Sequence, residues 1–111
     1  MRRSPLGRLV TVTVDRPLGS RHPRYPDTVY PINYGFVEGV AAQDGEWQDA
    51  YILGVAEPVT AFEGCVIAII RRLNDVEDKW VVAPDGTTFD AAQIRAATEF
   101  QERYFESVIE M

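Results

Sequence analysis

The chain has 111 residues, of which 46% are hydrophobic and 11% aromatic, enough to build one small hydrophobic core. Its formal net charge of −6 argues against nucleic-acid and membrane-surface binding, because both usually require a basic face. The longest apolar run, Cys65 to Ile70, is far too short to span a bilayer. We therefore expect a single domain over residues 1–111, located in the cytoplasm, without nucleic-acid or membrane partners.

Strand signals dominate the first three quarters of the chain. Alternating apolar and β-branched polar residues predict a strand at Leu9 to Val14, with the sequence L-V-T-V-T-V. Further strands, each bounded by glycine, proline, asparagine or aspartate, are expected at Ile32 to Val37, Ala50 to Val55, Phe62 to Leu73 and Trp80 to Ala83. The first two strands are separated by a proline-rich loop with basic side chains at Arg16, Arg21 and Arg24.

From Asp90 the apolar period becomes helical. Asp90, with Gln93 three residues later, resembles a capping box at a helix start. One apolar stripe follows at Ile94, Ala97, Phe100, Tyr104 and Val108, with Phe105 beside it. Five short strands and one such helix favour a mainly β (α+β) fold. We predict a small OB-like five-stranded β-barrel with a C-terminal α-helix packed across it.

Two acidic segments are candidates for a site. The turn from Asp44 to Asp49 carries three carboxylates within six residues, and Gly45 allows a conformation that brings them together. A cation between them would relieve their repulsion, and hard divalent ions such as Mg²⁺ prefer oxygen ligands. The alternative is a solvated acidic hairpin loop.

The second acidic segment comprises Asp75, Glu77 and Asp78, and it precedes Lys79. If this segment is extended, Asp75, Glu77 and Lys79 share one face while Asp78 points the other way. Two carboxylates beside an ammonium suit a cation that is bridged by a phosphate. An acidic protein can hold phosphate only through such cations or through a local group of arginines.

In their order and spacing these segments resemble the soluble family I inorganic pyrophosphatases. The family carries Y-P-x-N-Y-G and an aromatic residue, then D-G-D-P-x-D, then an acidic loop that ends in D-x-K. The matching segments are Y-P-I-N-Y-G-F at 30–36, D-G-E-W-Q-D at 44–49 and E-D-K-W-V-V-A-P at 77–84. Two more, V-D-R-P-L-G-S-R-H-P-R-Y at 14–25 and F-Q-E-R-Y-F at 100–105, are also similar to family segments. The resemblance implies metal-dependent hydrolysis of inorganic pyrophosphate to two phosphates.

The resemblance also implies roles for individual residues. The implied ligands of Mg²⁺, or of Mn²⁺ in its place, are Asp44, Asp49, Asp75 and Glu77, with Asp15 at an outer metal site. The implied phosphate contacts are Arg24, Lys79, Tyr34 and Tyr104. Glu46 would take or orient the proton of the attacking water, and Tyr34 would act beside it as a hydrogen-bond donor. Members of the family commonly assemble, so a homo-oligomer is expected.

The chain departs from the family pattern at several positions. Phe105 stands where the family has a phosphate-binding lysine, and Pro26 where it has a glutamate. The hairpin that carries a phosphate-binding arginine is absent, which leaves Arg21 and Arg24 as candidates for its role. Two functions therefore remain open: hydrolysis of pyrophosphate or another phosphoanhydride, and a non-catalytic pyrophosphatase-like module that binds metal or phosphate or serves in assembly.

Overall fold

The computed structural model describes residues 4–111 of the chain. Within this range, six strands and one helix follow in the order β1 (Leu9–Arg16), β2 (Asn33–Ala41), β3 (Trp47–Ile52), β4 (Ala61–Arg72), β5 (Asp78–Ala83), α1 (Ala91–Glu102) and β6 (Ser107–Glu110). No helix in this range is long and apolar enough to cross a membrane.

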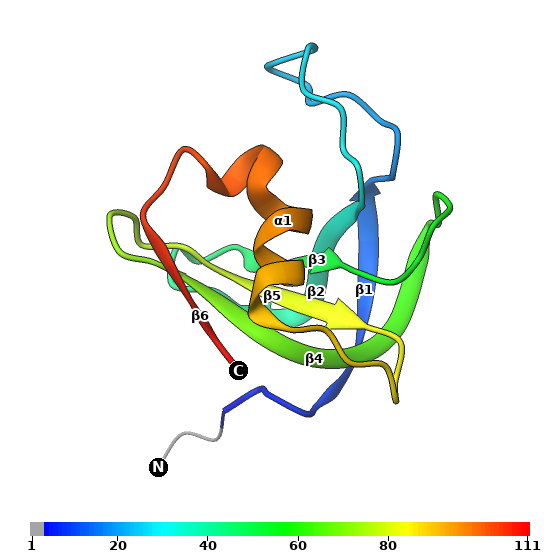
Figure 1. Ribbon diagram of the computed structural model, residues 1–111, viewed down its shortest axis with the longest axis vertical. Helices are drawn as coiled ribbons and strands as arrows, with labels where there is room; N and C mark the ends of the chain where they lie inside the picture. The colour runs from blue at the N-terminus through cyan, green and yellow to red at the C-terminus, as the bar shows by residue number, and fades with distance from the viewer. Residues whose placement is uncertain (1–3) are drawn as a thin grey trace.

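Five of the described strands form a closed barrel (Figure 1). Neighbouring strands run in the order β1-β2-β3-β5-β4, and β4 pairs with β1 to close the ring. The pair β3–β5 is parallel, whereas the other pairs in the ring are antiparallel. β6 pairs with β4 at Ile69 to Arg72, beyond the part of β4 that pairs with β1, and lies outside the ring. The predicted fold class, a mainly β five-stranded barrel with a helix, is confirmed, and β6 is an addition to it.

Alternation along the strands divides the core into two clusters. On β5, Trp80 and Val82 pack in one cluster, whereas Val81 between them packs in the other. α1 contributes Ile94, which is fully buried, to the cluster that contains Val81. The helix therefore covers one face of the barrel sheet, and its C-terminal end comes to lie near the ends of β2 and β3.

Residues of the segment Y-P-I-N-Y-G-F make close contacts with neighbouring parts of the barrel. Asn33 is fully buried; its Oδ1 accepts hydrogen bonds from Leu18 N at 2.9 Å and Val59 N at 3.2 Å. A Cβ atom on Gly35 would lie 1.9 Å from the carbonyl oxygen of Thr13, so only glycine allows β1 and β2 to approach this closely. These constraints fix the backbone on both sides of Tyr34.

The helix begins as predicted but ends earlier. Asp90 and Gln93 form the expected capping box. The helix stops at Glu102, so the prediction that its apolar stripe continues to Val108 was wrong. Val108 instead lies on β6 opposite Arg71 of β4, and Tyr104, in the turn between helix and strand, is 69% exposed. Pairing with the free edge of β4 outweighs the local helical period.

Several strand boundaries also differ from the predictions. β3 starts at Trp47 and ends at Ile52, before Gly54, whose φ of +82° is unfavourable for other residues. The segment from Asp75 to Lys79 is not extended throughout, because residues 73–76 form a turn before β5 begins at Asp78.

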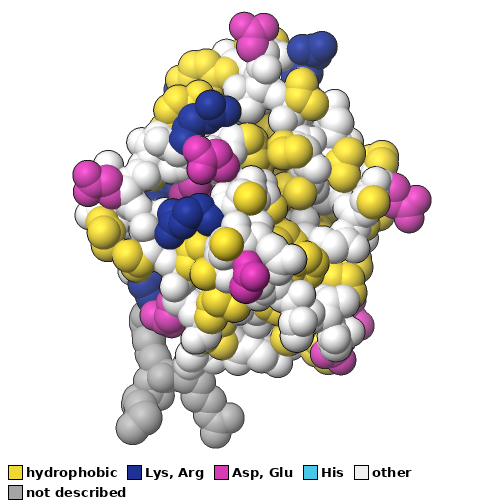
Figure 2. Space-filling view, viewed as in Figure 1, with side chains coloured by type: hydrophobic (Ala, Val, Ile, Leu, Met, Phe, Trp, Pro, Cys, Tyr) yellow, Lys and Arg dark blue, Asp and Glu magenta, His cyan; other side chains and the backbone are white. Residues whose placement is uncertain are grey.

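Charged side chains of both signs are interleaved on the face that carries α1. Figure 2 shows Lys and Arg side chains next to Asp and Glu side chains there, with apolar groups between them. The guanidinium of Arg71 forms ion pairs with Asp78 at 3.0 Å and Glu110 at 2.8 Å.

Candidate active site

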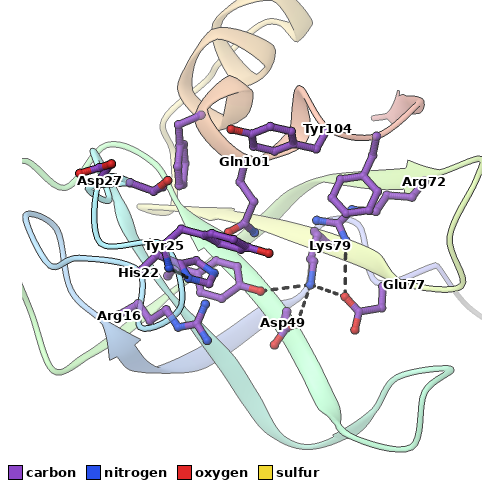
Figure 3. Close-up of a pocket in the computed structure, with 14 residues that line it drawn as sticks. Arg16, His22, Tyr25, Asp27, Asp49, Arg72, Glu77, Lys79, Gln101 and Tyr104 are labelled. Carbon is purple, nitrogen blue, oxygen red and sulfur yellow. Dashed lines mark hydrogen bonds and ion pairs between the residues drawn. The ribbon is translucent and has the colours of Figure 1, made fainter.

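An open pocket of about 840 Å³ lies between the barrel rim and the C-terminal end of α1 (Figure 3). Residues of β2, β3 and β5 form one side of it. The loop before β2 and the end of β1 form a second side, and the end of α1 with the following turn forms a third. Segments far apart in the sequence therefore contribute to one site.

Lys79 is the centre of this pocket. Its side chain is 3% exposed, and its Nζ donates to Asp49 Oδ2 at 2.6 Å, Glu77 Oε2 at 2.7 Å and Tyr34 Oη at 3.1 Å. Burial disfavours the ammonium, but Tyr34, Asp49 and Glu77 outweigh this effect, so the pKa of Lys79 is raised above its ordinary value. Burial also raises the pKa of Tyr34, which keeps its hydroxyl protonated. The pocket thus presents a fixed ammonium beside a neutral hydroxyl.

Arg72 forms a second cationic centre at the pocket wall. Its guanidinium binds Glu102 through two hydrogen bonds, from Nε at 3.1 Å and from Nη2 at 2.7 Å. It also donates to Asp75 at 3.1 Å and forms an ion pair with Glu77 at 3.5 Å. The same guanidinium lies 3.7 Å from the centre of the Phe105 ring. Arg72 therefore connects the pocket to α1, and its charge is already compensated.

Arg16 differs from Arg72 because it has no carboxylate partner among the described residues. Its Nη1 donates to the hydroxyl of the fully buried Tyr30 at 2.7 Å, and that hydroxyl donates to Gln101 Oε1 at 3.2 Å. Burial opposes its charge, but the hydrogen bond to Tyr30, together with the electrostatic effects of Tyr30, Tyr34 and Asp15, outweighs burial, and the pKa of Arg16 is raised. The Arg16 guanidinium lines the pocket with its charge available to an anion.

Five of the predicted site residues line this single pocket. They are Tyr34, Asp49, Glu77, Lys79 and Tyr104. Tyr30 and Tyr34 are both buried aromatic residues, and the hydroxyl of Tyr34 also reaches Lys79, so Tyr34 both packs in the core and contacts the site.

The other predicted residues lie outside the lining of this pocket. Arg24 lines an adjoining pocket together with Arg16 and Glu77. Asp44 and Glu46 are exposed in the turn between β2 and β3. Asp75 is paired with Arg72, and Asp15 is exposed on β1. The neighbouring Glu77 carboxyl is the main cause that lowers the pKa of Asp44.

The carboxylates match a divalent cation in chemistry but do not form a closed cage. Asp49 and Glu77 are hard oxygen donors that already converge on one cationic group, Lys79 Nζ. Within residues 4–111, no group of three His, Cys, Asp or Glu side chains lies close enough to hold a metal ion. Mg²⁺ usually binds through one or two carboxylates and takes water and substrate phosphates as its other ligands. The residues therefore fit a cation whose coordination is completed by a phosphate ligand.

Sequence reasoning missed three polar residues of the site: Arg16, Arg72 and Gln101. Arg16 was noted only as part of a basic loop, and it is Arg16, not Arg21, that lines the pocket, since Arg21 donates to the carbonyl oxygen of Pro26. Gln101 lies within the segment F-Q-E-R-Y-F, which was the available signal. Arg72 carried no local signal, because its role depends on where α1 packs.

His22 anchors the loop before β2. Its Nδ1 accepts hydrogen bonds from Arg24 N at 3.0 Å and Tyr25 N at 3.2 Å. Burial and the nearby charges of Arg16 and Arg24 lower the pKa of His22, so the imidazole stays neutral and able to accept these bonds. This half-buried histidine has a structural role in placing the loop against the pocket.

The barrel and its covering helix have the fold of the inorganic pyrophosphatases. The structure of an inorganic pyrophosphatase from Neisseria gonorrhoeae matches with a TM-score of 0.68 and 20% identity, covering 88% of this chain and 74% of that one. That of Helicobacter pylori matches with a TM-score of 0.64 and 16% identity, covering 99% and 85%. That of Thermus thermophilus has a TM-score of 0.62 and 15% identity, covering 100% and 84%.

At these identities the likeness shows a shared fold. No protein-family model and no curated protein sequence matches the chain. The sequence resemblance to the pyrophosphatases therefore agrees with the fold across nearly the whole chain, while the chemistry has to be argued from the pocket itself.

Proposed function

We propose that the pocket binds pyrophosphate, or another phosphoanhydride, together with a divalent cation and hydrolyses the anhydride bond. The observation that carries this proposal is the convergence of Asp49, Glu77, Lys79 and Tyr34 in one pocket. These residues come from β2, β3, β5 and the turn before β5, in a barrel with the pyrophosphatase fold. Arg16, which forms no ion pair with a carboxylate within residues 4–111, lines the same pocket.

Each group in the pocket has a chemical task in this proposal. Asp49 and Glu77 would hold the cation, Mg²⁺ or Mn²⁺, with Asp44 as a further oxygen donor beside Glu77. A bound cation would neutralise phosphate charge and lower the pKa of a water molecule. Lys79 and Arg16 would bind phosphate oxygens, and together they would stabilise the charge that develops on the leaving phosphate.

Tyr34, Tyr104 and Glu46 lie at different places, and we propose a different role for each. Tyr34 is buried, and its protonated hydroxyl could donate to a phosphate oxygen. Tyr104 lies at the pocket mouth and would contact the distal part of the substrate. Glu46 is exposed in the turn between β2 and β3, so its assignment as the group that handles the water proton stays a prediction for which Glu46→Gln is the test.

One observation favours a second candidate, a non-catalytic module that binds phosphate. Lys79 already neutralises Asp49 and Glu77, and no closed three-ligand metal site exists within residues 4–111. A pocket with Arg16 and Lys79 could hold a phosphoanhydride by charge and hydrogen bonds alone. The two candidate functions differ in whether the bound phosphoanhydride is hydrolysed.

The test is phosphate release from pyrophosphate in the presence of Mg²⁺ or Mn²⁺. We expect activity in the native protein and a loss of at least about a hundredfold in Asp49→Asn, which removes the charge of a cation ligand and keeps its shape. Glu63→Gln, an exposed position on β4 outside the pocket lining, is the matched control and should keep native activity. An inactive native protein that still binds pyrophosphate would identify the binding module.

A further inference from the structure

We propose that the substrate of this pocket is a phosphoanhydride that carries an aromatic ring, as a nucleoside diphosphate does. The inference rests on the proposed function and adds to it a class of substrate. It comes from the exposed aromatic side chains that line the pocket together with its charged groups.

The pocket is large for pyrophosphate. Its volume of about 840 Å³ lies high in the range of about 300–1,000 Å³ that is usual for sites of drug-sized ligands. The cationic groups Lys79 and Arg16, which would engage the phosphates of an anhydride, line only part of the pocket. The remaining space would be left to water if pyrophosphate were the whole ligand.

Two exposed tyrosines border this space. Tyr25 is 59% exposed and Tyr104 is 69% exposed, and both line the pocket. Neither ring belongs to the two hydrophobic clusters of the core, so core packing does not account for them. Exposed aromatic rings next to bound phosphates provide stacking surfaces for a base. The two rings come from separate segments, the loop before β2 and the turn after α1.

The backbone at Tyr25 is held by hydrogen bonds, and its ring contacts His22. Its backbone N–H donates to His22 Nδ1 at 3.2 Å, and its carbonyl accepts from Thr28 N at 2.9 Å. The ring also packs against His22, with 5.1 Å between ring centres. In Figure 3 the ring projects from the loop into the pocket toward Lys79. A ring on a held backbone loses less entropy on stacking than one on a free segment, which favours a binding role.

The reaction on such a substrate is the same hydrolysis. Water adds to the terminal phosphorus of the nucleoside diphosphate, forming one P–O bond. The bond from that phosphorus to the bridging oxygen breaks, and its electron pair leaves with the nucleoside monophosphate. The proton lost by the water passes to solvent, so the products are a nucleoside monophosphate and inorganic phosphate.

The experiment compares kcat/KM for ADP, pyrophosphate and tripolyphosphate with Mg²⁺. Tripolyphosphate is larger than pyrophosphate but has no ring. We expect Tyr25→Ala to lower kcat/KM for ADP by roughly tenfold, as for the loss of one stacked base, and to leave both ring-free substrates within about twofold of native. Tyr25→Phe should keep most of the activity on ADP, because it retains the ring.

Val29→Ala is the matched control, since Val29 is exposed in the same loop and lies outside the lining of both pockets. It should leave all three substrates unaffected. Cleavage of pyrophosphate with no cleavage of ADP overturns this inference alone, as does a Tyr25→Ala variant that loses all substrates equally. If no anhydride is cleaved by native protein, the proposed function fails and this inference with it.

Discussion

Lys79 takes a position that an external cation would otherwise need to fill. Asp49 and Glu77 each place a carboxylate oxygen against its ammonium, at 2.6 Å and 2.7 Å. Their mutual repulsion is therefore relieved within the folded chain. A divalent cation has to compete with this ammonium, and the negative charge of a phosphoanhydride near Lys79 would make that exchange easier. We accordingly expect cation and anhydride to bind together.

At the residue scale, Arg16 should contribute strongly to pyrophosphate binding. It lines the pocket, and its described hydrogen-bond partner is the hydroxyl of Tyr30. Removing a charged hydrogen bond to a phosphate costs about 1.5–3 kcal/mol, which corresponds to a factor of roughly 10 to 150. Arg16→Gln should therefore weaken pyrophosphate binding by about that factor, measured by calorimetry with Mg²⁺.

The control for this prediction is Arg95→Gln. Arg95 is exposed on α1 and lines neither pocket, so the substitution makes the same change of charge far from the ligand. Equal losses in both variants would show that net charge, and not the position of Arg16, governs binding.

At the scale of elements, Glu102 fastens α1 to the barrel. It accepts two hydrogen bonds from Arg72 of β4 and one from the Tyr51 hydroxyl of β3, at 2.6 Å. Glu102→Ala removes the buried carboxylate partner of Arg72 and leaves it with the more exposed Asp75 and Glu77 and the Phe105 ring. We expect a loss of about 2–4 kcal/mol in the free energy of unfolding, measured by urea denaturation.

The exposed Glu99 on the same helix supplies the comparison for Glu102. Glu99→Ala should change the free energy of unfolding by less than about 0.5 kcal/mol. Similar effects of the two substitutions would contradict the anchoring role of Glu102.

The contact between β1 and β2 depends on a glycine. Gly35→Ala would put a methyl group onto the backbone of Thr13, 1.9 Å from its carbonyl oxygen. The strands would have to separate, and we expect the free energy of unfolding to fall by about 1–3 kcal/mol. Thr11→Ala, at an exposed position of β1, should be nearly neutral in the same thermal or urea measurement. A tolerated Gly35→Ala would mean that the two strands are not packed this tightly.

The elements show where sequence patterns suffice and where they do not. The alternation in L-V-T-V-T-V and the capping box at Asp90 are local signals, and both elements form where they were predicted. The end of α1 is different. Tyr104 and Val108 continue the helical spacing by coincidence, whereas the chain actually turns to pair β6 with the edge of β4. An edge pairing of four residues leaves too little periodicity to be recognised from the sequence.

At the scale of the whole molecule, stability should fall at alkaline pH. The pKa of Lys79 and that of Tyr34 are raised in the folded protein above the ordinary values of about 10.4 and 10. Above about pH 10 the folded state therefore holds more protons than the unfolded chain. The contribution of Lys79 and Tyr34 to the free energy of unfolding is complete below that pH and is lost as the pH rises through their pKa values in the folded protein.

This dependence is measurable by urea unfolding at a series of pH values from about 8 to 11. We expect the free energy of unfolding to be flat at the lower end and to fall above about pH 10. Tyr34→Phe should reduce the slope, because it removes one of the titrating groups. If Tyr34→Phe leaves the pH dependence of the free energy of unfolding unchanged, the ionisation of Tyr34 is not coupled to folding.

The site as a whole was only partly visible in the sequence. Separate acidic motifs predicted that Asp49 and Glu77 converge, and both line the pocket with Lys79. The buried pair of Arg72 with Glu102 could not be predicted, because these residues meet only once β4 and α1 are packed. Arg16 likewise gains its place through the buried hydroxyl of Tyr30. Long-range packing therefore determines which charged side chains form ion pairs within the chain and which can bind a ligand.

The most direct test of the account is a calorimetric titration of Mn²⁺ into the native protein, with and without a non-hydrolysable pyrophosphate analogue. We predict weak binding of Mn²⁺ alone, since Lys79 occupies Asp49 and Glu77, and binding at least about tenfold tighter with the analogue present. Asp49→Asn should abolish this coupling. Equal Mn²⁺ affinity with and without the analogue, or no binding in either case, would contradict the central claim that cation and phosphoanhydride share this pocket.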